Sequence, residues 1–285
     1  MSDSTITWLR YNGALLLTDP TGRSIPSDHQ VIRRDARRQV LRQRVLFARW
    51  TSDYDAFEQS QWWYCLRDKP ISLDALDTKQ RYRIRQGLKN ADYVRIMPGD
   101  DILISQMWDV ACASFAKYPA KYRPHLEKES FFATIKEQMS QMECWGCVEK
   151  SENRLVGYAF CMFIGDIVSL QVVKVDPDYL KKEINAGLAF TLCDEYLNKR
   201  HFYCVSDGER NIRHETQYQQ FLCRVLGFRL SYCRLNVVYH PLVGVAVACL
   251  YPFRSLIGKL GEKSPLIYNL YSLLRQEEIA RSFKS

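Results

Sequence analysis

The chain has 285 residues, of which 47% are hydrophobic and 13% aromatic, and it carries a formal net charge of +8. This composition predicts an ordered globular protein of one large or two modest domains and excludes a disordered chain. The basic balance favours acidic partners such as nucleotides, tRNA or anionic lipid headgroups without identifying one, and a basic protein with no such partner is the alternative.

Ten cysteines are scattered through the chain, mostly within apolar runs. This distribution predicts reduced, buried thiols in a cytoplasmic protein. Cys144 and Cys147 form the one CxxC motif, but no second pair completes a zinc site, and on a strand the two side chains face opposite sides. We therefore expect core cysteines and no metal. The opening residues lack the apolar segment of a signal peptide, and the most apolar run, 242–253, is shorter than the roughly 18 residues that span a bilayer.

The first block, residues 1–90, combines short strand patterns with an arginine-rich amphipathic stretch. Asn12-Gly13 breaks its opening strands, and Val45–Trp50 and Trp62–Leu66 predict two more. The arginines of the stretch are Arg33, Arg34, Arg37, Arg38, Arg42, Arg44 and Arg49. They form either a phosphate-binding face, for tRNA or a lipid-linked pyrophosphate, or a solvated helix face. A basic helix over 79–89 leads to the second block.

The segment 167–200 joins a strand, a tight turn and a helix. Ile167–Val175 is apolar at most positions, which predicts a central strand covered on both faces. Asp176-Pro177 ends this strand, because proline cannot donate to a ladder. The helical pattern repeats every fourth residue at Ile184, Leu188, Leu192 and Tyr196. The free N–H groups and positive dipole end at the start of this helix, beside Lys181 and Lys182, predict a site for a phosphate or pyrophosphate.

The elements on both sides of this segment complete a recognisable order. Strands are predicted at 93–98, 143–150, 154–164, 201–208 and 229–239, and helices at 101–119, 128–141 and 214–228. The order β-α-α-β-β-β-α-β-α-β, with LGFR at 226–229 closing the last helix, resembles the GNAT acyltransferase fold. The resemblance covers roughly residues 92–240 and implies an α/β fold with a mixed central sheet flanked by helices.

The resemblance also implies acyl-CoA, acetyl-CoA above all, held by its pyrophosphate at the turn after the fourth strand. That turn usually reads Arg/Gln-x-x-Gly-x-Gly/Ala, and the matching run 180–185 has Glu183 and Asn185 in the glycine places. The residues matched to cofactor binding are Val173, Val175, Lys181, Lys182 and Asn185. The tyrosine that often protonates the departing thiolate has its place at Cys223.

The whole chain resembles FemA/FemB/FemX-like proteins in its organisation. Those proteins resemble two GNAT units in tandem and attach amino acids from aminoacyl-tRNA to cell-wall precursors. We expect a small α/β block over 1–90, which is a truncated or degenerate first copy, a GNAT-like domain over 91–240, and a helical extension over 241–285. The extension predicts two helices split near 261–265. It either contacts a membrane or a partner or, as we prefer, packs on the first block.

The resemblance places the reacting centre where strands 167–175 and 201–208 splay apart, beside the polar loop 206–216. His214 has a natural pKa near neutrality and is the expected general base, with Glu215 orienting it or serving as base itself. The acid is either Tyr218 or Cys223. The residues expected to bind substrate are Asp207, Arg210, Asn211, Thr216 and His125. Helix capping is the alternative role for Glu215 and Thr216.

Three functions follow as hypotheses. The first is an acyl-CoA-dependent N-acyltransferase acting on a small amine or amino sugar. The second is a FemABX-like transferase of the bacterial cell envelope that uses aminoacyl-tRNA. The third is a GNAT-like binding module that has lost catalysis. We expect a cytoplasmic protein, with peripheral membrane contact through the C-terminal helices left open, and the sequence leaves the oligomeric state undetermined.

Overall fold

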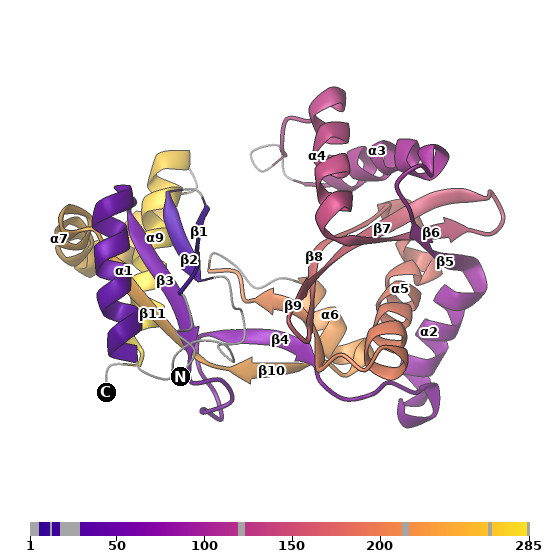
Figure 1. The fold of residues 1–285 in the computed structure, drawn as a ribbon, viewed down its shortest axis with the longest axis horizontal. Helices are drawn as coiled ribbons and strands as arrows, with labels where there is room; N and C mark the ends of the chain where they lie inside the picture. The colour runs from indigo at the N-terminus through magenta and orange to yellow at the C-terminus, as the bar shows by residue number, and fades with distance from the viewer. Residues whose placement is uncertain are drawn as a thin grey trace. The chain divides into compact units, whose positions relative to one another are not determined.

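The computed structural model describes residues 6–11, 13–17, 29–118, 123–212, 217–261 and 264–283 (Figure 1). The chain forms two compact units whose segments alternate along the sequence. Unit 1 contains residues 1–64, 209–216 and 230–285, and unit 2 contains residues 65–208 and 217–229.

Unit 1 is built on a four-stranded sheet in the order β1-β2-β3-β11. Its strands are β1 (Trp8–Tyr11), β2 (Ala14–Leu17), β3 (Phe47–Ser52) and β11 (Arg234–Tyr239). The central strand β3 runs parallel to β2 and antiparallel to β11. Helix α1 (His29–Gln43) covers one face of the sheet and α9 (Pro265–Arg281) the other (Figure 1). Helices α7 (Pro241–Leu250) and α8 (Arg254–Gly261) connect β11 to α9.

Helix α1 forms where the arginine-rich stretch was predicted to be amphipathic. Ile32, Ala36 and Val40 recur every fourth residue and are buried against Leu15 and Trp50. Residues four apart lie on one face of a helix, so the intervening arginines face outward. The arginines therefore form an exposed helix face, which is compatible with both a solvated face and a phosphate-binding face.

Unit 2 is built around a seven-stranded sheet in the order β10-β4-β9-β8-β7-β6-β5. The strands are β4 (Trp63–Arg67), β5 (Ala91–Ile96), β6 (Glu143–Glu149), β7 (Arg154–Ile164), β8 (Ile167–Val175), β9 (Cys204–Glu209) and β10 (Arg229–Tyr232). From β5 to β8 neighbouring strands are antiparallel, whereas β8 and β9 are parallel, so the sheet is mixed as predicted.

Helices cover both faces of this sheet (Figure 1). Helices α3 (Asp101–Ala116) and α4 (Lys128–Gln141) lie on one face, and α2 (Thr78–Asn90), α5 (Ile184–Cys193) and α6 (Gln217–Leu226) on the other. The four positions predicted to be apolar on α5 and its extension, Ile184, Leu188, Leu192 and Tyr196, are all fully buried. Complete burial of the repeating face is why this segment is helical despite its β-branched and aromatic residues.

The structure corrects the sequence-based description in three places. The predicted strand 229–239 is divided at Cys233 into β10 and β11, which belong to different sheets. Likewise β3 and β4, expected to share the first block, lie in different sheets. The reason is that periodicity reports which faces of a strand are buried but not which strand it pairs with. A 3₁₀ helix, η3 (Pro177–Lys182), also precedes α5, so the helix begins later than residue 180.

The contact between α2 and α5 predicts the effect of adding one methyl group. A Cβ on Gly87 would lie 2.4 Å from the carbonyl oxygen of Glu183 and 2.7 Å from the amide nitrogen of Gly187, and both are backbone atoms that cannot turn aside. We expect Gly87→Ala to lower the free energy of unfolding by about 1–3 kcal/mol, measured by chemical denaturation. Gly244→Ala, also in a helix but with 3.5 Å of space, should be neutral or stabilising by up to about 1 kcal/mol. Equal effects in both variants would contradict this packing.

Candidate functional site

Strands β8 and β9 pair over a short stretch and then separate. In the described structure their register joins Ile167 to Cys204, Val168 to Val205, and Ser169 to Ser206, although β8 continues to Val175. The edge of β8 from 170 onward therefore offers backbone N–H and C=O groups to an extended ligand, in the way that strand addition uses a sheet edge. This is the splay that the sequence predicted.

A β-bulge lies just beyond the last pair. Opposite β8, Cys161 pairs with Leu170 and Phe160 pairs with Val172, so Gln171 is the additional residue on β8. Its side-chain amide donates to Ser169 Oγ at 2.7 Å. Bulges bend a strand and redirect its backbone groups, and they are common beside active sites. The splay and the bulge together open the side of β8 that faces β9 at a defined point.

Asp207 is the first residue of β9 after the paired stretch. Burial raises the pKa of its carboxyl group to about 7, and a hydrogen bond with the side chain of Gln219 on α6 opposes part of that rise. A carboxyl group with a pKa near 7 is half ionised at neutral pH, so it can accept a proton and return it. We expect this residue to bind substrate, and a carboxyl group with this pKa is also a candidate general base.

Tyr218, a predicted acid, lies in the first turn of α6 and stacks on Phe221 with ring centroids 5.8 Å apart. Its hydroxyl oxygen is buried and has no hydrogen-bond partner among the described residues. Burial first, and then the nearby carboxyl group of Asp207, raise the pKa of this hydroxyl well above its ordinary value. It therefore stays protonated at neutral pH and is available as a donor.

Cys223, the other candidate acid, faces Cys65 of β4. The two sulfur atoms lie 3.9 Å apart, and Cys65 Sγ is 4.0 Å from the carbonyl oxygen of Gln219. The hydrogen bond between the thiols and the burial of Cys65 raise the pKa of Cys65. The structure thus supplies Cys223 with a thiol neighbour 158 residues away, which sequence reasoning did not find.

The turn between β8 and α5, where the pyrophosphate was expected, carries charged side chains that pair with other side chains of the protein. Glu183 adopts the left-handed conformation (φ 59°, ψ 30°) that glycine adopts most easily. Its carboxylate lies at the positive end of α5 and forms two 2.8 Å hydrogen bonds with Arg83 of α2. Lys182 is paired at 2.7 Å with Glu149, whose side chain is 3% exposed. Lys181 is exposed and Asn185 half-buried.

Helix α2 packs directly on this turn. Its residue Gly87 is in close contact with the backbone at Glu183, and Asn90 donates to the carbonyl oxygen of Lys182 at 3.0 Å. A capping box between Asp77 and Gln80 fixes where α2 begins. The protein itself therefore provides the anion at the first turn of α5, which is the carboxylate of Glu183, and the cation that pairs with it, which is Arg83.

The remaining predicted residues of β8 divide between the two faces of the strand. Val173 and Val175 share one face, and Val175 is buried. On the opposite face, Lys174 lies 4.0 Å from the ring centre of Phe115 and 5.4 Å from that of Tyr118. His125, predicted to contact the acceptor, is exposed in the segment between α3 and α4.

The predicted polar loop is only partly described. His214, Glu215 and Thr216 lie outside the described residues. Arg210 is 7% exposed, donates to the carbonyl oxygens of Gln61 and Asn211 at 3.0 and 3.2 Å, and lies 4.3 Å from the ring centre of Trp63. These contacts hold unit 1 together, so Arg210 has a structural role there, and its main-chain neighbour Asn211 is half-buried.

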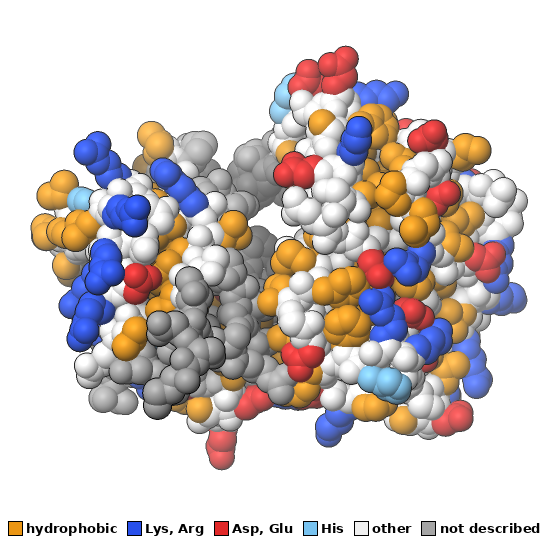
Figure 2. Space-filling view, viewed as in Figure 1, with side chains coloured by type: hydrophobic (Ala, Val, Ile, Leu, Met, Phe, Trp, Pro, Cys, Tyr) orange, Lys and Arg blue, Asp and Glu red, His pale blue; other side chains and the backbone are white. Residues whose placement is uncertain are grey.

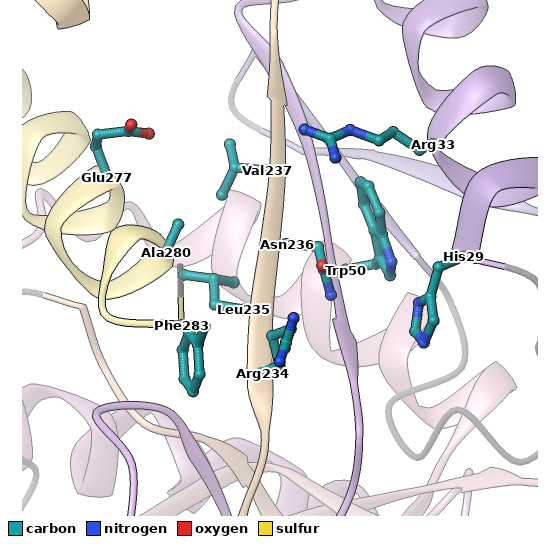
Figure 3. Close-up of a pocket in the computed structure, with 10 residues that line it drawn as sticks. All are labelled: His29, Arg33, Trp50, Arg234, Leu235, Asn236, Val237, Glu277, Ala280 and Phe283. Carbon is teal, nitrogen blue, oxygen red and sulfur yellow. The ribbon is translucent and has the colours of Figure 1, made fainter. Parts of the chain in front are cut away.

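Unit 1 contains a small cavity of about 160 Å³ at the edge strand β11. Figure 3 shows His29, Arg33 and Trp50 on one side of this strand, and Glu277, Ala280 and Phe283 on the other. None of the predicted site residues lines it. Two residues that line this cavity are already paired with the carboxylate of Asp53. His29 lies 3.4 Å from it and Arg234 lies 3.0 Å from it. The splay in unit 2 is therefore the better candidate. Within the described ranges no three His, Cys, Asp or Glu side chains are grouped to hold a metal ion.

Solved structures share this architecture although the sequence matches no family model and no curated protein. The C-terminal domain of a protein assigned as a lysylphosphatidylglycerol synthetase from Agrobacterium fabrum matches with a TM-score of 0.53 and 9% identity, over 86% of this chain and 84% of that one. FemX matches with a TM-score of 0.50 and 9% identity, over 79% and 81%. The fold is GNAT-like, with FemX-like organisation.

A tandem GNAT protein from the clavulanic acid biosynthesis pathway also matches, with a TM-score of 0.43 and 12% identity, over 80% of this chain and 75% of that one. The match to FemX, with its TM-score of 0.50, confirms the organisation drawn from the order of elements at the level of the fold. At these identities the comparisons carry no residue roles, so the site depends on the contacts described above.

The ion pair of Lys182 predicts a change in acid stability. Hydrogen bonds from Lys182 and from Ser151 lower the pKa of Glu149 from 4.5 to about 2. A lowered pKa stabilises the folded chain above pH 4.5, and this contribution is lost as the pH falls toward 2. We expect Glu149→Gln to lower the free energy of unfolding by about 1–3 kcal/mol at pH 7, and the difference from wild type to shrink between pH 4.5 and 2. Glu137→Gln, at an exposed position of α4, is the control; a pH-independent effect of Glu149→Gln would contradict the ion pair.

Proposed function

We propose that this protein is an acyltransferase that moves an acyl group from an activated ester or thioester to an amine of a small molecule or amino sugar. The observation that carries the proposal is the carboxyl group of Asp207, with its pKa raised to about 7, at the point where β8 and β9 separate. Attack by an amine requires removal of a proton from an ammonium group near neutral pH, and this carboxyl group is matched to that task.

In the proposed reaction the donor lies along the open edge of β8. Asp207 accepts a proton from the acceptor ammonium, and the free amine attacks the acyl carbonyl carbon. The backbone at the Gln171 bulge is available to bind the carbonyl oxygen as it gains negative charge. A new C–N bond forms, the C–S or C–O bond to the donor breaks, and the Tyr218 hydroxyl gives its proton to the leaving group. The proton on Asp207 then restores Tyr218, and the second proton that the nitrogen loses as the amide forms is released to solvent, so each turnover of an ammonium acceptor releases one proton.

Two donors are compatible with this chemistry. Acyl-CoA is the donor that the GNAT resemblance implies, and its pyrophosphate would need the first turn of α5. Aminoacyl-tRNA is the donor that the FemABX resemblance implies. One observation favours the second donor: Glu183 places a carboxylate at that turn, and Arg83 and Gly87 of α2 pack against it. An anion already lies where a pyrophosphate would bind, and the cation beside it is already paired.

The general-base role of Asp207 is tested through the pH dependence of turnover. Because an acid with a pKa of about 7 must be ionised to accept a proton, we expect kcat/KM to rise as the pH increases toward 7 and then to level off. Asp207→Asn should lower kcat/KM about 10²- to 10⁴-fold. Asp178→Asn, at an acid that is 82% exposed in the same unit, is the matched control and should leave turnover unchanged.

Stability separates a catalytic role from a structural one. A carboxyl group whose folded pKa is raised favours folding below its unfolded pKa, and this contribution is lost as the pH rises through 7. Asp207→Asn should therefore have an equal or higher melting temperature than wild type at pH 8, although it is inactive. A variant that is less stable at pH 8 and inactive would indicate a structural residue, and an active variant would overturn the assignment.

The donor is tested by titration and by transfer. A ligand present at 100 times its Kd stabilises the folded protein by about 2.7 kcal/mol. We expect acetyl-CoA and desulfo-CoA to produce no saturable thermal shift up to millimolar concentration. Labelled aminoacyl-tRNA should instead transfer its amino acid to an amine acceptor, with a rate that falls steeply between 50 and 200 mM salt. A saturable shift with acetyl-CoA, together with acetyl transfer, would establish acyl-CoA as the donor.

A further inference from the structure

Helices α7 and α8 of unit 1 present apolar side chains to solvent. Their exposed fractions are 76% for Leu242, 64% for Val245, 58% for Phe253, 59% for Leu256 and 41% for Leu260. The run Pro241–Leu260 has 20 residues and a mean hydropathy of 1.5, yet only 6% of its most apolar window is buried. It is longer than the 12-residue run noted in the sequence, because the apolar surface continues past Arg254 into α8. An exposed apolar surface of this extent marks an interaction site.

The same helices are attached to the unit on their other side. Gly258 of α8 packs on Tyr271 of α9, where a Cβ would lie 2.8 Å from the ring. Arg254 donates to Glu278 of α9 at 3.0 Å, and Val247 of α7 is buried. Crossing a bilayer would break these contacts and bury the paired Arg254 in hydrocarbon. The exposed side is therefore suited to contact at a surface.

Basic residues border this apolar surface. The amide of His240, just before α7, donates to the carbonyl oxygen of Leu46 at 2.9 Å, so α7 begins beside the residues that follow α1. Leu41 and Leu46 are themselves 53% and 46% exposed. The exposed arginines of α1 and its C-terminal end are Arg33, Arg34, Arg37, Arg38, Arg42 and Arg44. Figure 2 shows hydrophobic side chains over α7 with Lys and Arg side chains of the α1 region directly beside them.

Within the described part of the chain, none of the six guanidinium groups makes an ion pair, whereas Arg49, Arg234, Arg254, Arg275 and Arg281 in the same unit do. A surface that is apolar at its centre and cationic at its border is complementary to a layer of hydrocarbon beneath anionic headgroups. A symmetric contact between two copies of the chain would instead bring two cationic borders together.

We propose that α7, α8 and the arginines of α1 form a docking surface for an anionic lipid bilayer. The apolar side chains enter the boundary between headgroups and acyl chains, and the guanidinium groups contact lipid phosphates. Docking depends on unit 1 alone and is independent of the chemistry proposed for unit 2.

The test is co-sedimentation of the full chain with vesicles of phosphatidylcholine, with and without 30% phosphatidylglycerol. We expect binding that requires phosphatidylglycerol and weakens with salt. Leu242→Glu combined with Val245→Glu should weaken partitioning at least tenfold, and Arg37→Glu combined with Arg38→Glu should weaken it roughly tenfold. Ile102→Glu, at an apolar residue of unit 2 that is 75% exposed, is the matched control and should bind as wild type does.

Four outcomes would overturn the proposal. They are no vesicle binding at low salt, equal binding with and without phosphatidylglycerol, resistance of the bound protein to carbonate extraction, and arginine variants that lose tRNA binding while keeping vesicle binding. A wild-type chain that is dimeric in light scattering, and monomeric after Leu242→Glu, would assign the surface to a second copy. Because all four substituted positions are exposed, unchanged melting temperatures serve as the check on folding.

Discussion

The separation of β8 from β9 after Ser169 and Ser206 is the constraint on which the candidate site depends. Two parallel strands that stay paired would satisfy each other's backbone groups and leave no place for a ligand. Here the pairing stops after three residues of β8, and the bulge at Gln171 bends the strand at that point. The open edge of β8 begins at this interruption of the ladder, and Asp207 is the next residue of β9.

Burial raises the pKa values of two groups beside the opened strand. Asp207 lies beside α6, and its pKa is raised because the charged form loses water without gaining a full counter-ion. Tyr218 on the same helix is affected by the same burial and by Asp207 itself. The same burial raises the pKa of both groups, but their ordinary pKa values differ. The pKa of Asp207 therefore lies near neutrality, whereas the Tyr218 hydroxyl stays protonated. Such a pair can work as base and acid together.

The turn before α5 shows how the charges at one position of a shared fold can be arranged. A helix N-terminus attracts an anion, and in this chain Glu183 supplies one from the protein itself. Arg83 then balances Glu183, and Glu149 balances Lys182, so the charges at the turn are matched in pairs. The basic character of the chain is instead expressed in unit 1, where the arginines of α1 face solvent next to an apolar surface. The fold alone would not have distinguished these two distributions of charge.

Much of the fold was predictable because its signals are local. The strand Ile167–Val175 and helix α4 were predicted at their observed bounds, since an apolar run and a helical pattern are signals that lie within one element. The division of 229–239 at Cys233 was not predictable, because the choice of partner strand depends on residues far along the chain.

The candidate site was predictable only in part, for the same reason. Residue types marked Asp207, Tyr218 and Cys223 as polar or reactive groups near the splay, but Arg83 meets Glu183 across 100 residues and Cys65 meets Cys223 across 158. The sequence by itself determined which faces of each element are apolar and which loops are polar. Only the tertiary structure decided which charges neutralise one another and which carboxyl group loses its water, because burial and pairing are properties of contacts that exist only once distant segments have packed.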